Sequence, residues 1–173
     1  MASTIPPTRM VVTTHKNDGV SIFAADTVCE AFQPFGPGKS SFSSFHKSDT
    51  VPASNQTALP ILTNTLPRSP PSGVLFCTTD IAPNSSAPMH RTLSLDYAVV
   101  LAGEIVLRLD GGREKTVKQN EVIVQRGTNH EWHNRTDEWC RILVVMVGAE
   151  AVKLGGGEVL GETVFGKPAP PPA

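Results

Sequence analysis

The chain has 173 residues, enough for one domain of ordinary size. Its 15 Lys and Arg residues nearly balance its 16 Asp and Glu residues, so the formal net charge is −1. This balance argues against a nucleic-acid binder, which needs a concentrated basic surface. With 14 glycines and 15 prolines, the chain is also poorly suited to long helices, which excludes helix bundles and coiled coils.

Membrane and secreted classes are also disfavoured. No stretch approaches the roughly 18 consecutive apolar residues of a membrane-spanning helix. The N-terminal stretch lacks a continuous apolar run and contains Pro6 and Pro7, so we expect no secretory signal. The three cysteines, Cys29, Cys77 and Cys140, lack CxxC spacing and are expected to be reduced thiols. We therefore expect a cytoplasmic protein that binds neither membranes nor nucleic acids.

Residues 1–72 are predicted to form an irregular arm that packs on the rest of the domain. Two β-rich runs, 10–14 and 20–23, flank the turn residues 17–19 and predict a hairpin. The stretch 26–72 is rich in proline, with one short strand predicted near 41–48. A segment of this kind is expected to lie over the domain or to form a lid, because it cannot build its own core.

Residues 73–148 hold six apolar or β-branched runs separated by short turns. Many short strands with Gly-rich turns predict an antiparallel sandwich or barrel. The run 142–147 has no polar face, which is typical of a strand buried on both sides. Residues 149–173 form a C-terminal extension, whose Pro-rich end, 167–173, is expected to be flexible.

Polar residues suited to chemistry gather at two places in this segment. His90, Thr92 and Asp96 are separated by even numbers, so an extended strand points all three to one face. His130 lies on a later predicted strand and would meet His90 and Asp96 if the two strands share a barrel. Two imidazoles and a carboxylate can hold a divalent metal with open positions. They can equally act without a metal as an acid–base set.

This pattern resembles the two sequence motifs of the cupin superfamily, whose members are small jelly-roll barrels. The first motif, G-x5-H-x-H-x3,4-E-x6-G, is matched in spacing by Asn84, His90, Thr92, Asp96 and Gly103. The end of the second motif, G-x5-P-x-G-x2-H-x3-N, is matched by Gly127, His130 and Asn134. Asn in place of the first glycine is a mild change, because Asn tolerates a left-handed backbone. More narrowly, the sequence resembles small cupins of fungal secondary metabolism.

Besides Asn84, the sequence departs from the cupin pattern at four positions. Thr92 stands where a second metal-binding histidine is expected, and Asp96 replaces a glutamate that is one methylene longer. Gln119 and Gln125 replace the opening glycine and the proline of the second motif. The resemblance thus implies His90, Asp96 and His130 as catalytic residues, with either one divalent metal (Zn, Fe, Mn or Ni) on these three side chains or none.

Four residues are candidates for binding a small-molecule substrate. Thr92 and Trp132 share the inward parity of the histidines. Gln125 and Arg126 are expected at the pocket mouth, where the planar guanidinium of Arg126 suits a substrate carboxylate. Two of the four also have a plainer interpretation. Trp132 could simply pack in the core, and Arg126 could form an ion pair on the surface. His133 has odd spacing from the inward histidine and is expected on the outer surface.

The resemblance implies an all-β, cupin-type jelly-roll barrel and an enzyme of the lyase or isomerase class. Decarboxylation, dehydration or a double-bond shift on a polyketide-type or carboxylate-bearing metabolite would use His90 or His130 to move a proton and Asp96 to fix the imidazole tautomer. Two alternatives stay open, an iron(II) oxygenase and a non-catalytic ligand-binding cupin. A homodimer is expected, with strands of residues 8–50 extending a partner's sheet.

Overall fold

The structure, a computed structural model, describes residues 3–56, 58–59, 62 and 64–163, and every regular element in them is a β-strand. The strands are β1 (Arg9–His15), β2 (Ser21–Val28), β3 (Ser41–Ser48), β4 (Val74–Ile81), β5 (Ser85–Ser86), β6 (Ser94–Ala102), β7 (Glu104–Leu109), β8 (Glu114–Lys118), β9 (Val122–Arg126), β10 (His130–Asn134), β11 (Cys140–Gly148), β12 (Val152–Lys153) and β13 (Val159–Leu160). Within these described ranges, no helix is long and apolar enough to cross a membrane.

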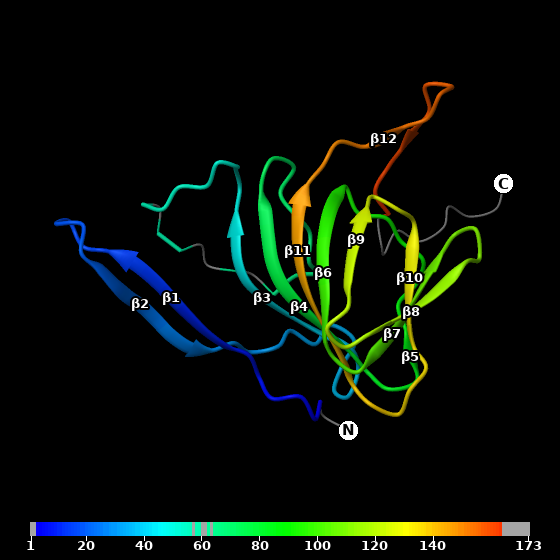
Figure 1. The fold of residues 1–173 in the computed structure, drawn as a ribbon, viewed down its shortest axis with the longest axis horizontal. Helices are drawn as coiled ribbons and strands as arrows, with labels where there is room; N and C mark the ends of the chain where they lie inside the picture. Colours follow the sequence, from blue (N-terminus) through cyan, green and yellow to red (C-terminus); the bar gives the residue numbers. More distant parts are fainter. Residues whose placement is uncertain (1–2, 57, 60–61, 63, 164–173) are drawn as a thin grey trace.

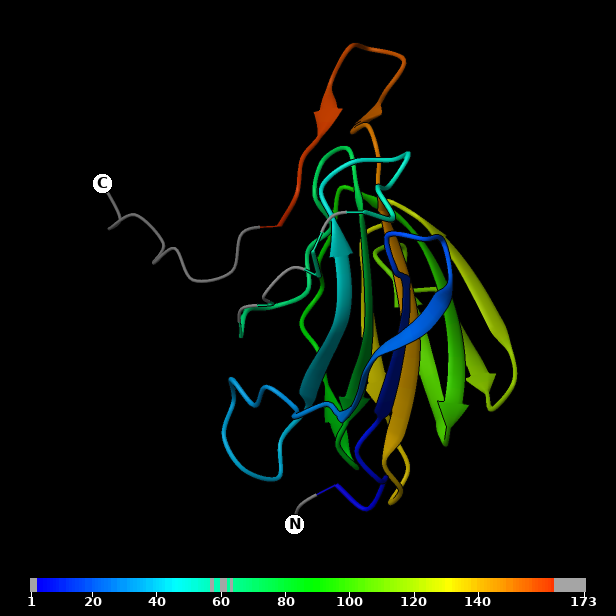
Figure 2. The same ribbon diagram turned by 90° about the vertical axis from the view of Figure 1, so that its left-hand side faces the viewer.

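Hydrogen bonding divides the strands of the domain body into two antiparallel sheets (Figure 1). One has the order β3-β4-β11-β6-β9 and the other β5-β10-β7-β8, while β1-β2 and β12-β13 are separate hairpins. The two larger sheets form two layers when the molecule is seen from the side (Figure 2). The predicted all-β cupin jelly roll is confirmed, as an open barrel rather than a fully closed one.

Apolar side chains from both sheets pack between the layers. This buried cluster comprises Ile81, Ala98, Val100, Ile105, Val117, Cys140 and Ile142. Along β6 the inward positions run from Val100 through Ala98 to Asp96, all of them buried. A polar region therefore begins inside the barrel where the apolar cluster ends.

The N-terminal arm contributes more to the domain than a covering loop. β1 and β2 pair as the predicted hairpin, which projects from the body beyond β3 (Figure 1). The strand predicted near 41–48 is β3, and it pairs with β4 to become the edge of the five-stranded sheet. The predicted flexible stretch 167–173 lies outside the described residues.

Two positions of the first cupin motif have a left-handed backbone. Asn84 has a φ of 48° and Gly103 a φ of 71°. Gly103 lies at the tight turn between β6 and β7, where a Cβ atom would stand 2.7 Å from the carbonyl oxygen of Trp139. The motif spacing thus preserves a backbone requirement as well as side chains.

We predict that Gly103→Ala lowers the free energy of unfolding by about 2 kcal/mol, because the methyl group combines a left-handed φ with a backbone clash. Gly111→Ala is the matched control, since Gly111 lies in a neighbouring turn with open space around it. Urea denaturation followed by tryptophan fluorescence measures both. Equal effects of the two substitutions would contradict this account.

Candidate active site

A cavity of about 510 Å³ lies between the two sheets, next to the apolar cluster. Its apolar lining includes Ile81, Ala98, Ile123, Trp132, Val144 and Met146 from the barrel, together with Phe35, Phe42 and Leu66 from the N-terminal arm. Its polar lining includes Arg68, His90, Thr92, Asp96, Gln125 and His130. An apolar cavity with a few converging polar groups is the usual form of a small-molecule site.

Strand register brings the polar groups together in two cross-strand pairs. Asp96 on β6 is the register partner of Gln125 on β9. His90 and His130 face each other across an isolated antiparallel bridge and exchange both backbone hydrogen bonds, at 2.8 and 2.9 Å. Directly opposed residues share a face, so their side chains are neighbours. The centroids of the two imidazole rings are 4.3 Å apart.

The side chain of Gln125 connects the two pairs. Its Nε2 donates to Oδ2 of Asp96 at 3.2 Å and lies 3.2 Å from Nε2 of His130. One amide nitrogen can serve both acceptors, since it carries two hydrogens. All three residues are buried. Gln125, predicted to bind substrate at the pocket mouth, therefore also holds Asp96 and His130 in place.

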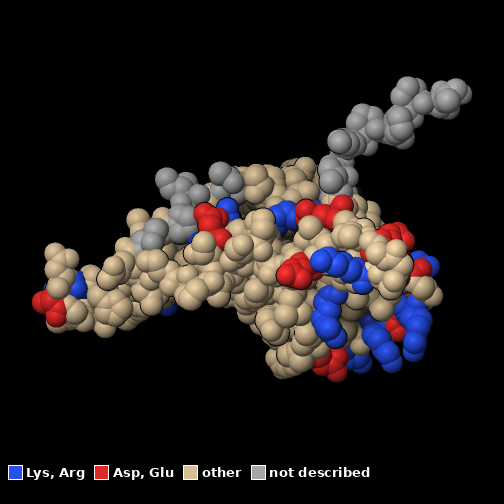
Figure 3. All heavy atoms as spheres, turned by 90° about the horizontal axis from the view of Figure 1, so that it is seen from above, with Lys and Arg blue, Asp and Glu red and all other residues tan. Residues whose placement is uncertain are grey.

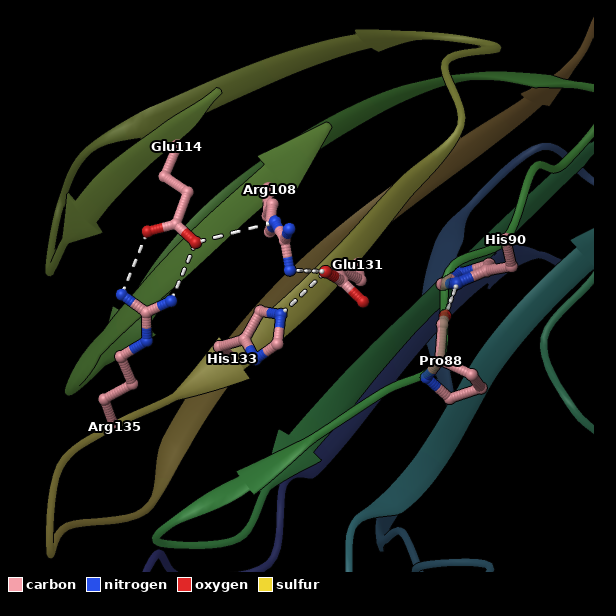
Figure 4. A network of polar contacts seen from close by, with 7 residues as sticks. All are labelled: Pro88, His90, Arg108, Glu114, Glu131, His133 and Arg135. Carbon is pink, nitrogen blue, oxygen red and sulfur yellow. Dashed lines mark hydrogen bonds and ion pairs between the residues drawn. The ribbon is translucent and has the colours of Figure 1, made fainter. Parts of the chain in front are cut away.

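Backbone carbonyls define the tautomer of each histidine. Nδ1 of His130 lies 3.0 Å from the carbonyl oxygen of Thr128. Nδ1 of His90 lies 2.8 Å from the carbonyl oxygen of Pro88, as Figure 4 shows. A carbonyl only accepts, so we assign the ring hydrogen to Nδ1 and the lone pair to Nε2 in both rings. The expectation that Asp96 fixes the tautomer needs correction, because Gln125 lies between Asp96 and His130.

Burial favours the neutral form of all three titratable groups in this cluster. Desolvation, aided by the neighbouring His90, lowers the pKa of His130 to about 4. Desolvation also lowers the pKa of His90, with a smaller contribution from the positive charge of Arg68. Desolvation raises the pKa of Asp96, although Ser94, Gln125 and Arg68 oppose it. Near neutral pH both histidines are therefore unprotonated bases.

Two buried oxygen atoms in the cluster have no hydrogen-bond donor among the described residues. They are Oδ1 of Asp96 and Oε1 of Gln125. A buried acceptor without a donor is costly, and such groups occur where a ligand or water completes the bonding. These atoms suit a ligand that presents hydroxyl or other O–H and N–H groups.

The three predicted metal ligands do not fit a metal in this arrangement. Among the residues that the structure describes, no three His, Cys, Asp or Glu side chains are grouped so that they could hold a metal ion. The amide nitrogen of Gln125 is a donor group, and it stands between His130 and Asp96 where a shared cation would lie. Thr92, at the family's second histidine position, accepts a hydrogen bond from Ser94 at 2.8 Å.

The other predicted site residues divide between the cavity and the surface. Trp132 lines the cavity and packs edge-on against His130, with ring centroids 5.3 Å apart. Arg126 is exposed and follows the inward Gln125 by one residue, so the structure places it outside the cavity lining. This corrects its expected role at the pocket mouth, because successive residues of a strand face opposite sides.

His133 takes part in a separate polar network on the four-stranded sheet (Figure 4). Its Nε2 lies 3.0 Å from Oε1 of Glu131, which also pairs with Arg108 at 2.9 Å. Glu114 and Arg135 continue the network with two short hydrogen bonds. These contacts agree with the outward orientation predicted for His133, and His133 is absent from the cavity lining.

Sequence reasoning missed Arg68, which brings a positive charge to the cavity. It belongs to the Pro-rich arm, outside both motifs, and motif spacing therefore gives no indication of it. One signal was available, since Arg68 is the only Asp, Glu, Lys or Arg residue between Asp49 and Asp80. A single cation in a long uncharged segment is unusual, but only the tertiary structure shows that the Arg68 side chain lines the cavity.

Comparison with known proteins supports a common origin with fungal biosynthetic proteins. The family model described as "Cupin domain" matches residues 77–146. The phomopsin biosynthesis cluster protein C' of Diaporthe leptostromiformis is 35% identical over 171 residues, covering 94% of this chain and 89% of that protein. The cupin-domain-containing oxidoreductase virC of Hypocrea virens is 51% identical over 57 residues, covering 33% of this chain and 29% of its own.

Solved structures share the fold at low sequence identity. The polyketide cyclase RemF from Streptomyces resistomycificus matches with a TM-score of 0.50 at 21% identity, covering 81% of this chain and 82% of that one. The cupin domain of Schizosaccharomyces pombe Cnp3 matches with a TM-score of 0.53 at 12% identity, covering 80% and 86%. At such identities the likeness concerns the fold alone.

The lowered pKa of His130 predicts a pH-dependent stability. Between the folded-state pKa of about 4 and the ordinary 6.5, the unfolded chain binds more protons, so stability falls as the pH decreases through this window. We expect wild type to lose up to about 3 kcal/mol more than His130→Gln between pH 7 and pH 4. Urea denaturation at several pH values measures this, with the exposed His15→Gln as control. Parallel pH profiles for wild type and His130→Gln would contradict the assignment.

Proposed function

Because this chain belongs to the cupin superfamily, we propose that it is an enzyme of the lyase or isomerase class acting on a polyketide-type or carboxylate-bearing metabolite. The observation that carries this proposal is the bridge His130–Gln125–Asp96, next to His90, at the polar side of an apolar cavity. Relatives named for biosynthesis clusters support a place in secondary metabolism.

The site has the parts needed for acid–base chemistry. A neutral imidazole Nε2 takes a proton from a carbon next to a substrate carbonyl, and His90 can supply it. His130 can do so only when the Gln125 amide turns away from its Nε2. A neutral Asp96 carboxylic acid can give a proton to the developing enolate oxygen or to a departing hydroxyl group. In a dehydration, the proton taken from carbon and the proton given to the hydroxyl balance to release water.

The environment of the cluster favours this use of the residues. The raised pKa of Asp96, caused mainly by burial, favours the protonated acid. The lowered pKa values of the two histidines, also caused mainly by burial, keep both bases unprotonated. Both imidazoles can therefore accept a proton from a substrate near neutral pH. Trp132 and the other apolar side chains of the lining surround these groups and can pack against an apolar substrate.

We predict that His130→Ala lowers turnover at least about a hundredfold, because it removes a base and the acceptor that orients Gln125. The matched control is His133→Ala, which changes a histidine of the same strand outside the cavity and is expected to keep nearly full turnover. Product formation from candidate polyketide-type acids is followed by liquid chromatography and mass spectrometry. Full turnover by a correctly folded His130→Ala would exclude the histidine mechanism.

The names of several relatives favour a second candidate function, a redox reaction on a small molecule. virC and the protein fogC of Aspergillus ruber are both named cupin-domain-containing oxidoreductases. If this reaction uses a metal on His90, Asp96 and His130, Gln125 must leave its position between two of them. Metal analysis before and after chelation tests this candidate. Stoichiometric metal whose removal abolishes turnover would favour it, whereas turnover insensitive to chelator supports acid–base chemistry.

We also propose a homodimer, on two unpartnered apolar surfaces of the same chain. One is the β1–β2 hairpin, in which Phe23 is 76% exposed. The other is the outer side of β6 and β9, where Tyr97, Val122 and Val124 are 51%, 71% and 60% exposed and where Tyr97 and Val124 are register partners. An isolated two-stranded hairpin is only marginally stable in water. We therefore expect another protein surface to pack against the hairpin, and likewise against the exposed apolar side chains of β6 and β9.

A second copy is the occupant that suits both surfaces. The hairpin lies beyond β3 and the other patch includes β9, at opposite edges of the five-stranded sheet, so they cannot meet within one molecule (Figure 1). A two-fold axis parallel to the strands brings the hairpin of one copy to β9 of the other. Charged side chains gather mainly on the end of the molecule opposite the hairpin (Figure 3), which agrees with an apolar contact.

We predict a dimer for wild type and a monomer for Val124→Lys or Phe23→Lys, because a buried unpaired ammonium opposes association. Size-exclusion chromatography with light scattering gives the mass. Val159→Lys on β13 is the matched control, since Val159 is exposed but belongs to neither surface. A monomeric wild type, or a dimer that survives both substitutions, would contradict this interface.

A further inference from the structure

Arg68 stands between two cavities. It lines the large cavity together with His90 and Asp96, and it lines a smaller one of about 110 Å³ together with Glu162. Its Nε lies 2.6 Å from Oε1 of Glu162, and its Nη1 donates to the carbonyl oxygen of Pro67 at 2.7 Å. The guanidinium is thus fixed at the wall of the candidate active site and already binds a carboxylate.

The C-terminal extension holds that carboxylate in place. Thr163, which follows Glu162, donates from its backbone N–H to the carbonyl oxygen of Arg91 at 3.0 Å. The N–H of Arg91 donates to Oγ1 of Thr163 at 2.9 Å. These two bonds fasten the extension beside His90, the residue that precedes Arg91. A carboxylate is therefore presented to Arg68 next to the catalytic cluster.

The charges that line the large cavity favour an anionic ligand. Among the described residues, its lining holds two permanent cations, Arg68 and Lys39, and one carboxyl group, Asp96. Burial raises the pKa of Asp96, although Ser94, Gln125 and Arg68 oppose this shift. Arg68 lines the same cavity as Asp96 and His90, and its positive charge favours a lower pKa in both groups. Apolar walls cover most of the remaining lining, so the ligand needs an apolar body.

We propose that Arg68 binds the carboxylate of the substrate and that Glu162 is an internal competitor which occupies Arg68 until substrate arrives. This deepens the proposed function and rests on it only in placing the substrate in the same cavity. A planar guanidinium matches a carboxylate with two parallel hydrogen bonds. The ligand class is an organic carboxylate with an aromatic or polyene body. Exchange of Glu162 for substrate keeps the guanidinium paired throughout.

Two matched probes test the anion site without turnover. 2-Naphthoate and 2-naphthamide have the same shape and differ by one negative charge. We expect wild type to bind naphthoate more tightly than naphthamide in isothermal titration calorimetry. Arg68→Gln should weaken naphthoate binding about tenfold, the loss of one charge-assisted contact, and leave naphthamide binding within about twofold.

Lys39→Gln is the control for the overall positive charge, because Lys39 also lines the cavity. It should change naphthoate binding less than Arg68→Gln does. Glu162→Gln tests the competition and should tighten naphthoate binding several-fold, since the competing carboxylate is removed. Glu158→Gln, a neighbouring exposed change on the same extension, should have no effect.

Several results would overturn the proposal. The first is a wild type that binds naphthoate no more tightly than naphthamide. The second is an Arg68→Gln variant that loses affinity for both probes equally, or a Lys39→Gln variant that loses as much naphthoate affinity as Arg68→Gln does. The third is a Glu162→Gln variant whose naphthoate binding is unchanged or weaker. Its failure is distinguishable from failure of the proposed function. His130→Gln should lose turnover and still bind naphthoate, whereas an absence of turnover in a naphthoate-selective wild type would refute the reaction and leave the anion site.

Discussion

Strand register is the constraint on which the site depends. Asp96 meets Gln125, and His90 meets His130, because β6 pairs with β9 and a backbone bridge joins the two histidines. A slip of one residue in either pairing would turn these side chains to the opposite face of the sheet. The apolar cluster prevents such a slip, since it would expose Ala98 and Val100 together with Asp96. Packing of the core therefore builds the polar cluster.

Hydrogen bonds connect the members of the polar cluster. Burial favours the neutral forms of the two histidines and of Asp96, and one amide nitrogen bridges two acceptors. Two oxygens are left for a ligand. Permanent positive charge comes from Arg68 and Lys39, both in the arm. In the proposed function, the barrel supplies the groups for proton transfer and the flanking segments supply the cation that binds the substrate.

The chemistry-bearing residues of the barrel were predictable because they lie within two motifs of fixed spacing. Even spacing predicted His90 and Asp96 on one inner face, and the cavity holds both. The single extended strand assumed for them was wrong, because His90 precedes β6 and pairs with His130 in an isolated bridge. Arg126 shows the limit of such reasoning, since alternation along β9 places it outside while Gln125 points inward. The bridging position of Gln125 was not predictable, because it depends on the pairing of β9 with β6.

The sequence by itself determined the all-β cupin fold, the hairpin of the arm and the inward strand faces, because these follow from local alternation, turn residues and motif spacing. The tertiary structure alone decided that the amide of Gln125 separates His130 from Asp96, and that Arg68 and Glu162 meet beside the cavity. Arg68 and Glu162 are 94 positions apart in the sequence, as their numbers show. Contacts at such separations depend on how the chain packs, which no local pattern encodes.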